Sequence, residues 1–540
     1  MMAPSHSSTA ARAVIETLVA NGIDTIFGVP GGHSLPIYAA MSGDERIRHI
    51  LGRHEQGLGY MADGFARASG RIAAVSTTSG PAVANIACAM GQGTTDTSPI
   101  LVIASTPRSE LVGRNRGGLH DLNDSLEIAR AVCRYHEHCS SPDQVSQMLA
   151  GLISKLREGR PGTAYLQIPS DVMGAPFNGE ICTLDKPARL APEPTGIAQA
   201  VELLKRSKRP LIVAGTGCVI SEAGEEIRQL AERLGAVVST TVLGRGIIPG
   251  DHPNVIHIDG ASLTAVGEIF RKADVVLAIG TMFKEEDTCG WQIEMGEQLI
   301  HVDIDPEEFG RSYKAEVYIR ADARAACEAI NAALPSIEPA DSAWAAEAKA
   351  KQEESVESRR SSQGRDLQFA ESFRKILPRE ALFFTDRCNI GYWFFRCLPS
   401  YRERSFHYPM GYGGLGGTLP QAIGAKIARP DARVVALLGD GGMQFSMTDL
   451  AVAVQESLKL TIIVSNNHSY GAIKAGLGRN YPGVSLGTDL SGPDYEYIAK
   501  AYGIPYIKVC EREGFLKAFA DEVENDRLVM IEFDNDIADP

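Results

Sequence analysis

One region of the chain combines an acidic residue, glycines and asparagines in a spacing that suits a diphosphate bound through a divalent metal. Gly439-Asp440-Gly441-Gly442 is followed, 27 positions after the aspartate, by Asn467 in the run Asn466-Asn467-His468-Ser469. A carboxylate, an amide oxygen and a nearby backbone carbonyl are hard oxygen ligands, which Mg²⁺ prefers and shares with phosphates. Because glycines let the backbone approach a ligand closely, the region predicts a metal-diphosphate site.

Two apolar runs must position these residues. Residues 433–438 (RVVALL) and 460–465 (LTIIVS) predict buried parallel strands, and residues 448–456 between them predict a helix that begins with a capping box at Ser446 and Asp449. Ligands of open parallel sheets bind at the carboxyl ends of the strands, so Asp440 and Asn467 are expected to converge. Taken alone, Gly-Asp-Gly is equally compatible with an ordinary strand-loop-helix turn that contains a structural aspartate.

The full pattern resembles the thiamin-diphosphate enzymes of the acetolactate synthase, 2-oxo acid decarboxylase and benzoylformate decarboxylase group. The resemblance implies that Asp440, Asn467 and the backbone carbonyl of Ser469 hold Mg²⁺. It also implies that the cofactor is contacted by the residues around these ligands: Gly439, Asp440, Gly441, Gly442, Asn467, Ser469, Tyr470 and Gly471.

A second motif lies in the first third of the chain. Arg53-His54-Glu55-Gln56-Gly57 follows a strand-like run and opens a helix expected over residues 58–68. Its His-Glu pair is similar to the family's activating glutamate, which drives the cofactor's aminopyrimidine into its imino form from a dry pocket. The resemblance therefore makes Glu55 catalytic and cofactor-binding. The alternative is a glutamate that only stabilises the helix N-terminus.

Three further loops carry expected site residues. Gly28-Val29-Pro30-Gly31-Gly32-His33 resembles the family's first active-site loop, so His33 is expected to approach the substrate, although a turn histidine is almost as compatible. Thr78 lies in a Thr-Ser-Gly-Pro loop that resembles the pyrimidine surround, where Ala82 replaces a second glycine. His120 is a candidate proton relay, since imidazole titrates near neutral pH. The alternative is a loop histidine bound to a helix terminus.

The run Met410-Gly411-Tyr412-Gly413-Gly414-Leu415-Gly416 resembles the family's support for the bent cofactor. Leu415 matches the bulky residue beneath the cofactor rings, where acetolactate synthases usually carry Met, and Gly413 lies in its glycine-rich flank. Both are expected to bind the cofactor. Without that flank, Leu415 would be interpreted as a core residue.

Composition excludes several classes of function. The chain has 540 residues, 44% of them hydrophobic, and a net charge of −14. An acidic chain without a basic patch argues against nucleic acid as a partner. No apolar run reaches the length of a membrane span, and the first residues do not form a secretory signal. The ten cysteines include no C-x-x-C motif, which favours reduced thiols and a cytoplasmic location.

Alternating apolar runs and helical patterns predict an α/β protein of three parallel-sheet domains flanked by helices. The expected boundaries are residues 1–185, 190–335 and 367–540, with a proline-rich connection from Lys186 and a solvated helical linker over 336–366. The resemblance makes the first domain pyrimidine-binding, the second Rossmann-like and the third diphosphate- and Mg²⁺-binding. In the second domain, Ile220 replaces the third glycine after Gly215 and Gly217, so a dinucleotide fingerprint is incomplete and FAD is unlikely.

The resemblance implies thiamin-diphosphate- and Mg²⁺-dependent decarboxylation of a 2-oxo acid, through ylide attack and an enamine, to give an aldehyde. It also implies a homodimer or homotetramer in which Glu55 of one subunit faces the cofactor held by another. Decarboxylation is favoured because Leu415 and the run Tyr470–Ile473 depart from acetolactate synthase, and Leu119-His120-Asp121 is similar to 5-guanidino-2-oxopentanoate decarboxylases. The alternatives are an acetolactate synthase-like carboligase, a protein that only binds thiamin diphosphate, and an NAD- or FAD-dependent oxidoreductase.

Overall fold

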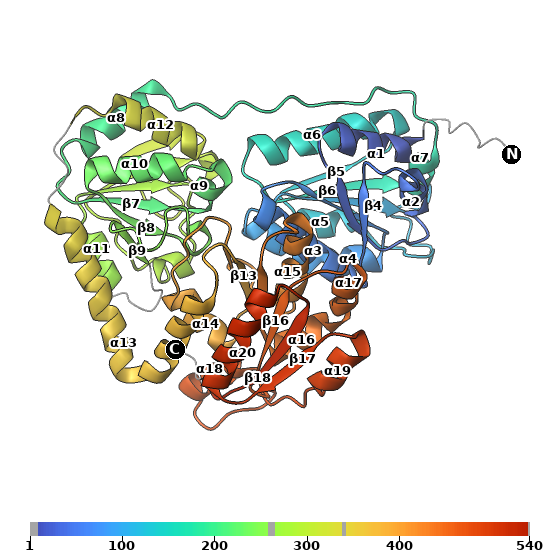
Figure 1. Ribbon diagram of the computed structural model, residues 1–540. Coiled ribbons are helices and arrows are strands. Elements are labelled where there is room, and N and C mark those ends of the chain that lie inside the picture. The colour runs from blue at the N-terminus through green and yellow to red at the C-terminus, as the bar shows by residue number, and fades with distance from the viewer. Residues whose placement is uncertain (1–8, 258–264, 337–341, 538–540) are drawn as a thin grey trace.

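A computed structural model describes residues 9–257, 265–336 and 342–537. The chain forms three α/β lobes, with the first and second side by side and the third against both (Figure 1). Two sequence predictions fall partly outside the described residues. They are the prediction that the first residues, here 1–8, form no secretory signal, and the linker prediction at residues 337–341.

The N-terminal domain is built on a six-stranded sheet with helices on both faces. Its strands are β1 (Thr25–Gly28), β2 (Arg48–Leu51), β3 (Ala73–Thr77), β4 (Ile100–Thr106), β5 (Tyr135–His138) and β6 (Thr163–Pro169). Its helices are α1 (Ala10–Ala20), α2 (Leu35–Met41), α3 (Glu55–Ser69), α4 (Pro81–Thr95), α5 (Ser125–Val132), α6 (Val145–Glu158) and α7 (Ser170–Gly174). Every residue of β3, β4 and β6 is buried, as expected for parallel strands covered on both faces.

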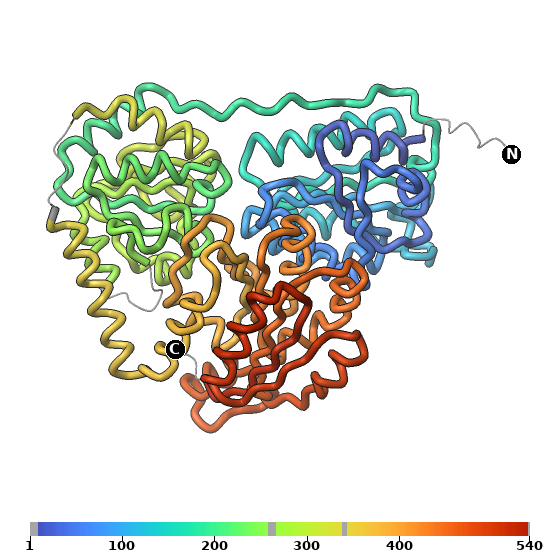
Figure 2. Tube along the Cα trace, in the orientation of Figure 1, coloured from blue at the N-terminus to red at the C-terminus, as the bar shows by residue number. Residues whose placement is uncertain are grey.

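The central domain follows an irregular connection that crosses from the first lobe to the second (Figure 2). Its strands are β7 (Pro210–Ala214), β8 (Val237–Thr240), β9 (Val255–His257), β10 (Val275–Ile279), β11 (Gln298–Asp303) and β12 (Val317–Arg320). Its helices are α8 (Pro194–Leu204), α9 (Thr216–Ser221), α10 (Gly224–Leu234), α11 (Ala265–Lys272) and α12 (Ala323–Ala333).

The C-terminal domain repeats the same construction. Its strands are β13 (Leu382–Thr385), β14 (Phe406–His407), β15 (Val434–Gly439), β16 (Thr461–Asn466), β17 (Tyr506–Val509) and β18 (Val529–Asp534). Its helices are α14 (Asn389–Cys397), α15 (Thr418–Ala428), α16 (Asp440–Ser446), α17 (Leu450–Gln455), α18 (Gly471–Asn480), α19 (Tyr495–Tyr502) and α20 (Arg512–Asn525).

Strand order relates the three sheets to one another. The N-terminal sheet has the order β2-β1-β3-β4-β6-β5 and the C-terminal sheet the order β14-β13-β15-β16-β18-β17, which is the same topology. The central order, β12-β11-β10-β7-β8-β9, matches the 3-2-1-4-5-6 arrangement of a Rossmann fold when its strands are numbered from β7. The predicted fold class, three parallel α/β sheets with a Rossmann-like one in the centre, is confirmed.

Helix α13 (Ser342–Ile376) corrects the expectation of a solvated linker. It is helical as expected, with a break in the backbone at Gln363, but it is not only a tether. Trp344 and Ala348 are buried in the core of the central domain, and the Trp344 indole N–H donates to the carbonyl of Pro210 at 2.9 Å. The contact could not be predicted from the mostly charged composition of the segment. Two apolar residues one helical turn apart lie on the same face of the helix and are enough to attach it.

The N- and C-terminal domains meet where α3 crosses α15. A Cβ at Gly64 would overlap the carbonyl oxygen of Gln421, and one at Gly424 would overlap that of Met61. The glycines therefore let the two backbones touch. The buried Asp63 carboxylate accepts from the Gln421 side-chain amide at 2.5 Å beside this crossing.

Two further expectations concern the whole chain. No helix in the described ranges is both long and apolar enough to cross a bilayer. The ten cysteines are free thiols, as their spacing predicts.

Candidate active site

The Gly-Asp-Gly-Gly motif lies where β15 passes directly into α16. An additional helix begins at Asp440, and the helix predicted over residues 448–456 follows it as a 3-10 turn (Met447–Asp449) and α17. The predicted capping box is absent, since the Ser446 hydroxyl has no hydrogen-bond partner among the described residues. A Cβ at Gly441 would stand 2.6 Å from the Tyr470 ring, and one at Gly442 would overlap the Asp386 carboxylate. Because glycine has no side chain, the N–H groups of the first helical turn at these positions are not covered. They point to the edge of the sheet and could bind an anion there.

Asp440 is buried at the start of α16, with 2% of its surface exposed. Burial raises the pKa of its carboxyl, against the opposing effect of N–H donors from Gly441 and Asn467. Its Oδ2 atom is shielded from solvent and has no partner among the described residues. A buried carboxylate oxygen without a partner is rare in proteins, and a metal ion would satisfy it.

Asn467 and Ser469 follow β16 at the same sheet edge. The Asn467 Oδ1 accepts from the backbone N–H and the hydroxyl of Ser469, both at 3.2 Å. The intervening His468 has a left-handed backbone, with φ of 53°, which turns the chain sharply at this point. The loop is fixed further by the Tyr470 N–H, which donates to the Thr488 carbonyl at 2.8 Å.

The donor set fits Mg²⁺. It contains one carboxylate, one amide oxygen and one backbone carbonyl, all hard oxygens. No cluster of three or more His, Cys, Asp or Glu side chains suited to a metal occurs in the described part of the chain.

Two supporting residues escaped the sequence analysis. Asp386 follows β13 and accepts from the Gly439 N–H at 3.1 Å, and burial raises its pKa to about 6. Its position after the apolar run of β13, which pairs with β15, was an available signal. The Tyr495 hydroxyl donates to the Asp440 carbonyl at 3.1 Å from α19, 55 residues along the chain, and nothing in its neighbourhood in sequence marks it.

The glycine-rich run before α15 uses backbone conformations that few residues other than glycine adopt. Gly413 and Gly416 adopt φ of 64° and 82°, in the left-handed region that favours glycine. A Cβ at Gly416 would stand 2.5 Å from that of Phe445, so the run packs against α16. Leu415 is half-buried, and its support of the cofactor stays a prediction.

Glu55 opens α3 in the N-terminal domain, three residues before the expected helix start. Its carboxylate accepts from the Asn85 side-chain amide at 2.9 Å, and Asn85 is a further residue that the sequence did not reveal. The preceding His54 caps the helix through its ring nitrogen. Within the described part of the chain, no hydrogen bond joins Glu55 to Asp440 or Asn467, and the expected arrangement of Glu55 across a subunit interface stays a prediction.

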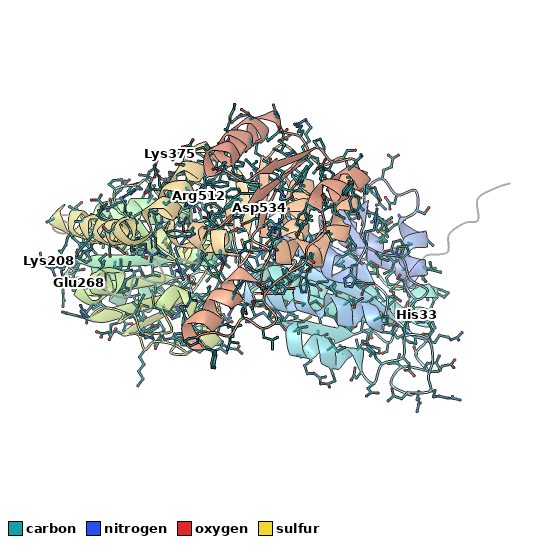
Figure 3. The ribbon with its side chains drawn as sticks, turned by 90° about the horizontal axis from the view of Figure 1, so that it is seen from below. His33, Lys208, Glu268, Lys375, Arg512 and Asp534 are labelled. Atoms are coloured by element: carbon teal, nitrogen blue, oxygen red, sulfur yellow. The ribbon has the colours of Figure 1, made fainter. Side chains whose placement is uncertain are left out.

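Three loops at the carboxyl edge of the N-terminal sheet bring the predicted histidines together. The His33 Nδ1 lies 3.0 Å from the Ser79 hydroxyl, and the His33 and His120 rings stand edge-to-face with centroids 5.4 Å apart. Burial, and then the neighbouring His120, lower the pKa of His33. The His120 Nδ1 is buried without a partner among the described residues. Figure 3 shows His33 on the N-terminal lobe, away from Asp534 at the end of β18.

Gly80 makes this convergence possible, because its φ of 64° and lack of a side chain admit the backbone of His120. Thr78 packs on Gly31. A Cβ built at Gly31 would stand 2.8 Å from the Thr78 methyl carbon and 3.2 Å from its hydroxyl oxygen. The Thr78 hydroxyl is buried and has no partner among the described residues. It is therefore free to take part in the expected pyrimidine contact, which stays a prediction.

A separate cavity of about 710 Å³ lies where the three domains meet, and residues at the carboxyl edge of the central sheet line part of it. Gly217, Gly280 and Asp303 line it, and Gly215 lies close by, where a Cβ would overlap the Gly280 carbonyl. The two glycines of the incomplete fingerprint are therefore needed for backbone packing between β7 and β10. The expectation that FAD is not bound stays a prediction.

Comparison with known proteins identifies the family. Three family models match in order: the thiamine pyrophosphate enzyme N-terminal TPP binding domain over residues 8–128, the central domain over 197–330 and the C-terminal TPP binding domain over 386–533. Thiamine pyrophosphate is thiamin diphosphate under its other name. The chain belongs to the thiamine pyrophosphate enzymes, and the two binding models fall on the domains that carry Glu55 and Asp440.

Individual relatives cover nearly the whole chain. A probable 2-ketoarginine decarboxylase of Pseudomonas aeruginosa is 34% identical over 93% of this chain and 89% of its own length. A probable acetolactate synthase large subunit of Methanocaldococcus jannaschii is 30% identical over 92% and 86%. An acetolactate synthase of Mycobacterium bovis is 29% identical over 97% and 88%. The protein is a thiamin-diphosphate-dependent enzyme of the lyase or carboligase type.

Proposed function

We propose that this protein is a 2-oxo acid decarboxylase that uses thiamin diphosphate and Mg²⁺ and releases an aldehyde. The observation that carries the decarboxylase assignment is the contact between His33 and His120. An aldehyde forms only if a proton is delivered to carbon after CO₂ leaves. Two imidazoles, one held by Ser79 and the other with a free ring nitrogen, supply a proton donor at a sheet edge.

Each part of the site has a distinct task in this proposal. Asp440, Asn467 and the Ser469 carbonyl hold Mg²⁺, and the backbone N–H groups of Gly441 and Gly442 bind the diphosphate. Gly439, Tyr470 and Gly471 shape the surrounding loops, while Gly413, Leu415 and Thr78 contact the rings. When bound, thiamin diphosphate supplies an electron sink for the electrons left on the substrate as CO₂ departs. Glu55 exchanges a proton with the pyrimidine and holds it in orientation.

The assembly is part of the proposal. Glu55 and the Asp440 cradle lie in different domains, and the family resemblance implies that Glu55 of one copy faces the cofactor held by another. A homodimer, or a homotetramer of two such dimers, places the active sites between subunits. The cytoplasmic location expected from the sequence stays a prediction.

A carboligase is the second candidate, and the acetolactate synthases among the relatives favour it. Such an enzyme would join the decarboxylated fragment of one substrate to the carbonyl of another. Incubation with pyruvate followed by a colorimetric acetoin assay separates the two, since acetolactate yields acetoin and free acetaldehyde does not.

The deciding experiment is a CO₂-release screen with thiamin diphosphate and Mg²⁺ over aliphatic, aromatic and guanidino 2-oxo acids. We expect stoichiometric CO₂ and aldehyde, the latter measured with alcohol dehydrogenase and NADH, and no turnover when EDTA replaces Mg²⁺. CO₂ release accompanied by a 2-hydroxyketone in place of aldehyde would establish the carboligase. Absence of CO₂ from every substrate would refute both.

A further inference from the structure

A cleft of about 930 Å³ opens between the central and C-terminal domains, beside the glycine-rich run that precedes Leu415. Gly413 lines it together with Tyr412, so the cleft adjoins the run expected to support the cofactor rings. Two large aromatic side chains face its solvent-filled space, Trp291 with 51% and Tyr412 with 47% of their surface exposed. Exposed aromatic rings in a cleft, in place of buried ones, point to a ligand that covers them.

Both rings are held in place without a ligand. The Trp291 indole N–H donates to the Phe283 carbonyl at 2.9 Å, and its backbone N–H donates to the Thr288 hydroxyl at 3.1 Å. The Tyr412 ring packs so closely on α4 that a Cβ at Gly91 would stand 2.6 Å from it. Because they are fixed beforehand, these faces lose little entropy on binding, and an aromatic face attracts a cation.

The cations that line the cleft are each paired with a carboxylate, and two of these carboxylates also hold a second cation. Lys284 pairs with Asp96 at 2.5 Å, Arg387 with Glu286 at 2.7 Å and Arg311 with Glu308 at 3.1 Å, while Asp96 also pairs with Arg67 and Glu308 with Arg160.

Two carboxylate groups retain free acceptor capacity. Glu286 uses Oε1 for Arg387, while its Oε2 is shielded from solvent and has no partner among the described residues. Glu285 is exposed and forms no ion pair within the described chain. A guanidinium or ammonium group would satisfy both and stack on the aromatic walls.

We propose that this cleft binds the positively charged tail of the 2-oxo acid substrate, with Glu285 and Glu286 as its anionic partners and Trp291 and Tyr412 as its walls. The inference rests on the proposed decarboxylase function and adds the substrate class. A substrate with a guanidino or amino group at the end of a flexible chain places its 2-oxo acid at the cofactor and its cation in the cleft.

The test compares two substrates that differ in charge and hardly in shape, 5-guanidino-2-oxopentanoate and its uncharged analogue 5-ureido-2-oxopentanoate. With holoenzyme, we expect kcat/KM for CO₂ release to favour the guanidino acid at least tenfold. In Glu285→Gln and Glu286→Gln this preference should fall at least tenfold, mostly through KM of the guanidino acid. Glu285→Lys should lower it further, because the new charge repels the tail.

Glu294→Gln is the matched control. It removes the same charge from an exposed position three residues after Trp291 and outside the cleft, so it should keep the wild-type preference. If the wild type turns over both substrates equally, or if the Glu285 and Glu286 variants keep its preference, the proposal that the cleft binds the substrate tail is wrong. The proposed decarboxylase function is not affected by that result. If a flavin copurifies and absorbs near 450 nm, the cleft holds a flat cofactor and the proposal for the substrate tail is also wrong. If no 2-oxo acid is turned over, the decarboxylase itself fails.

Discussion

Glu55 is the single side chain whose chemistry the proposed reaction cannot replace. Glu55→Gln preserves the size of the side chain and an oxygen that accepts from Asn85, but removes the proton that must be exchanged. We expect kcat to fall by about 10²–10⁴-fold, the range typical of a lost acid-base group. The thermal midpoint and Mg²⁺ binding should not change.

Glu45→Gln provides the comparison for this change. Glu45 is an exposed carboxylate of the same domain and lies outside the site, so its variant should retain full kcat. Full activity in Glu55→Gln itself would sink the catalytic assignment.

Asp449 gives a prediction in pH. It is buried beside Gly57, two residues from Glu55, and burial raises its pKa to about 7. An unfolded aspartate releases its proton near pH 4. Between about pH 4 and 7 the folded state therefore binds more protons than the unfolded state, so this group's contribution to stability falls as the pH rises. Asp449→Asn cannot ionise, and the cofactor-free variant should gain stability relative to wild type across that window.

Thermal midpoints from pH 4 to 8 measure the difference. Asp44 supplies a control of opposite sign, because Arg46 holds the pKa of its carboxyl well below the usual range. The stabilisation from Asp44 is fully present above pH 4 and is lost only as the pH falls towards its folded pKa, so Asp44→Asn should be less stable than wild type by a nearly constant amount from pH 4 to 8. Parallel curves for Asp449→Asn and wild type would contradict the assigned shift.

Among single residues, the sequence predicts those site residues whose position depends on local spacing along the chain. Asp440 and Asn467 could be predicted to share an edge because each ends a strand of one β-α-β unit. Tyr495 and Asn85 could not, because their contacts are set by how distant helices dock on that edge, and no local pattern encodes docking. His33 and His120 were identified separately, and only the left-handed turn at Gly80 brings them together.

The crossing of α3 and α15 is the element-scale feature with the sharpest consequence. Gly64→Ala would place a methyl group onto the Gln421 carbonyl, a backbone atom that cannot move away cheaply. We expect a loss of about 1–3 kcal/mol or more in the free energy of unfolding, as for other overpacked sites. A lower urea midpoint, measured by circular dichroism, is the readout.

Gly151→Ala in α6 is the control for this change. Nothing lies within 4 Å of a Cβ built there, so only the helix propensity of alanine acts and stability should rise by about 0.5–1 kcal/mol. Equal effects of the two substitutions would show that α3 and α15 do not approach each other as closely as described.

Sequence patterns also missed an element where glycine was involved. The helix expected over 448–456 is present as α17, but the sequence analysis did not predict α16 before it, whose glycines at 441 and 442 are poor helix formers. Helix α16 forms there because packing on Tyr470 and Asp386 admits no larger residue and overrides propensity. Likewise, α13 was interpreted as solvated from its average polarity, although Trp344 and Ala348 fix it to the central domain.

At the scale of the whole molecule, the shared topology of the outer sheets relates the two halves of the proposed site. Strands β2 and β14 occupy the same position in their sheets, and they are followed by α3 and α15. Glu55 begins α3, and the run containing Leu415 leads into α15, so both lie at the N-terminal ends of equivalent helices. The loop with Thr78 after β3 likewise corresponds to the Gly-Asp-Gly loop after β15. Two similar domains thus present different chemistry at equivalent edges, and in the proposed dimer the unlike edges of two chains meet at one cofactor.

This arrangement predicts complementation between two inactive variants. Glu55→Gln retains an intact Asp440 cradle, and Asp440→Asn retains an intact Glu55. In a mixed dimer, one of the two sites combines both lesions and the other is wild type. Equal co-expression with different affinity tags should give about half mixed dimers, and hence about a quarter of wild-type activity in the pool. If Glu55 serves the cofactor of its own chain, every site carries a lesion and mixing restores nothing, so the recovered CO₂ release decides between the two geometries.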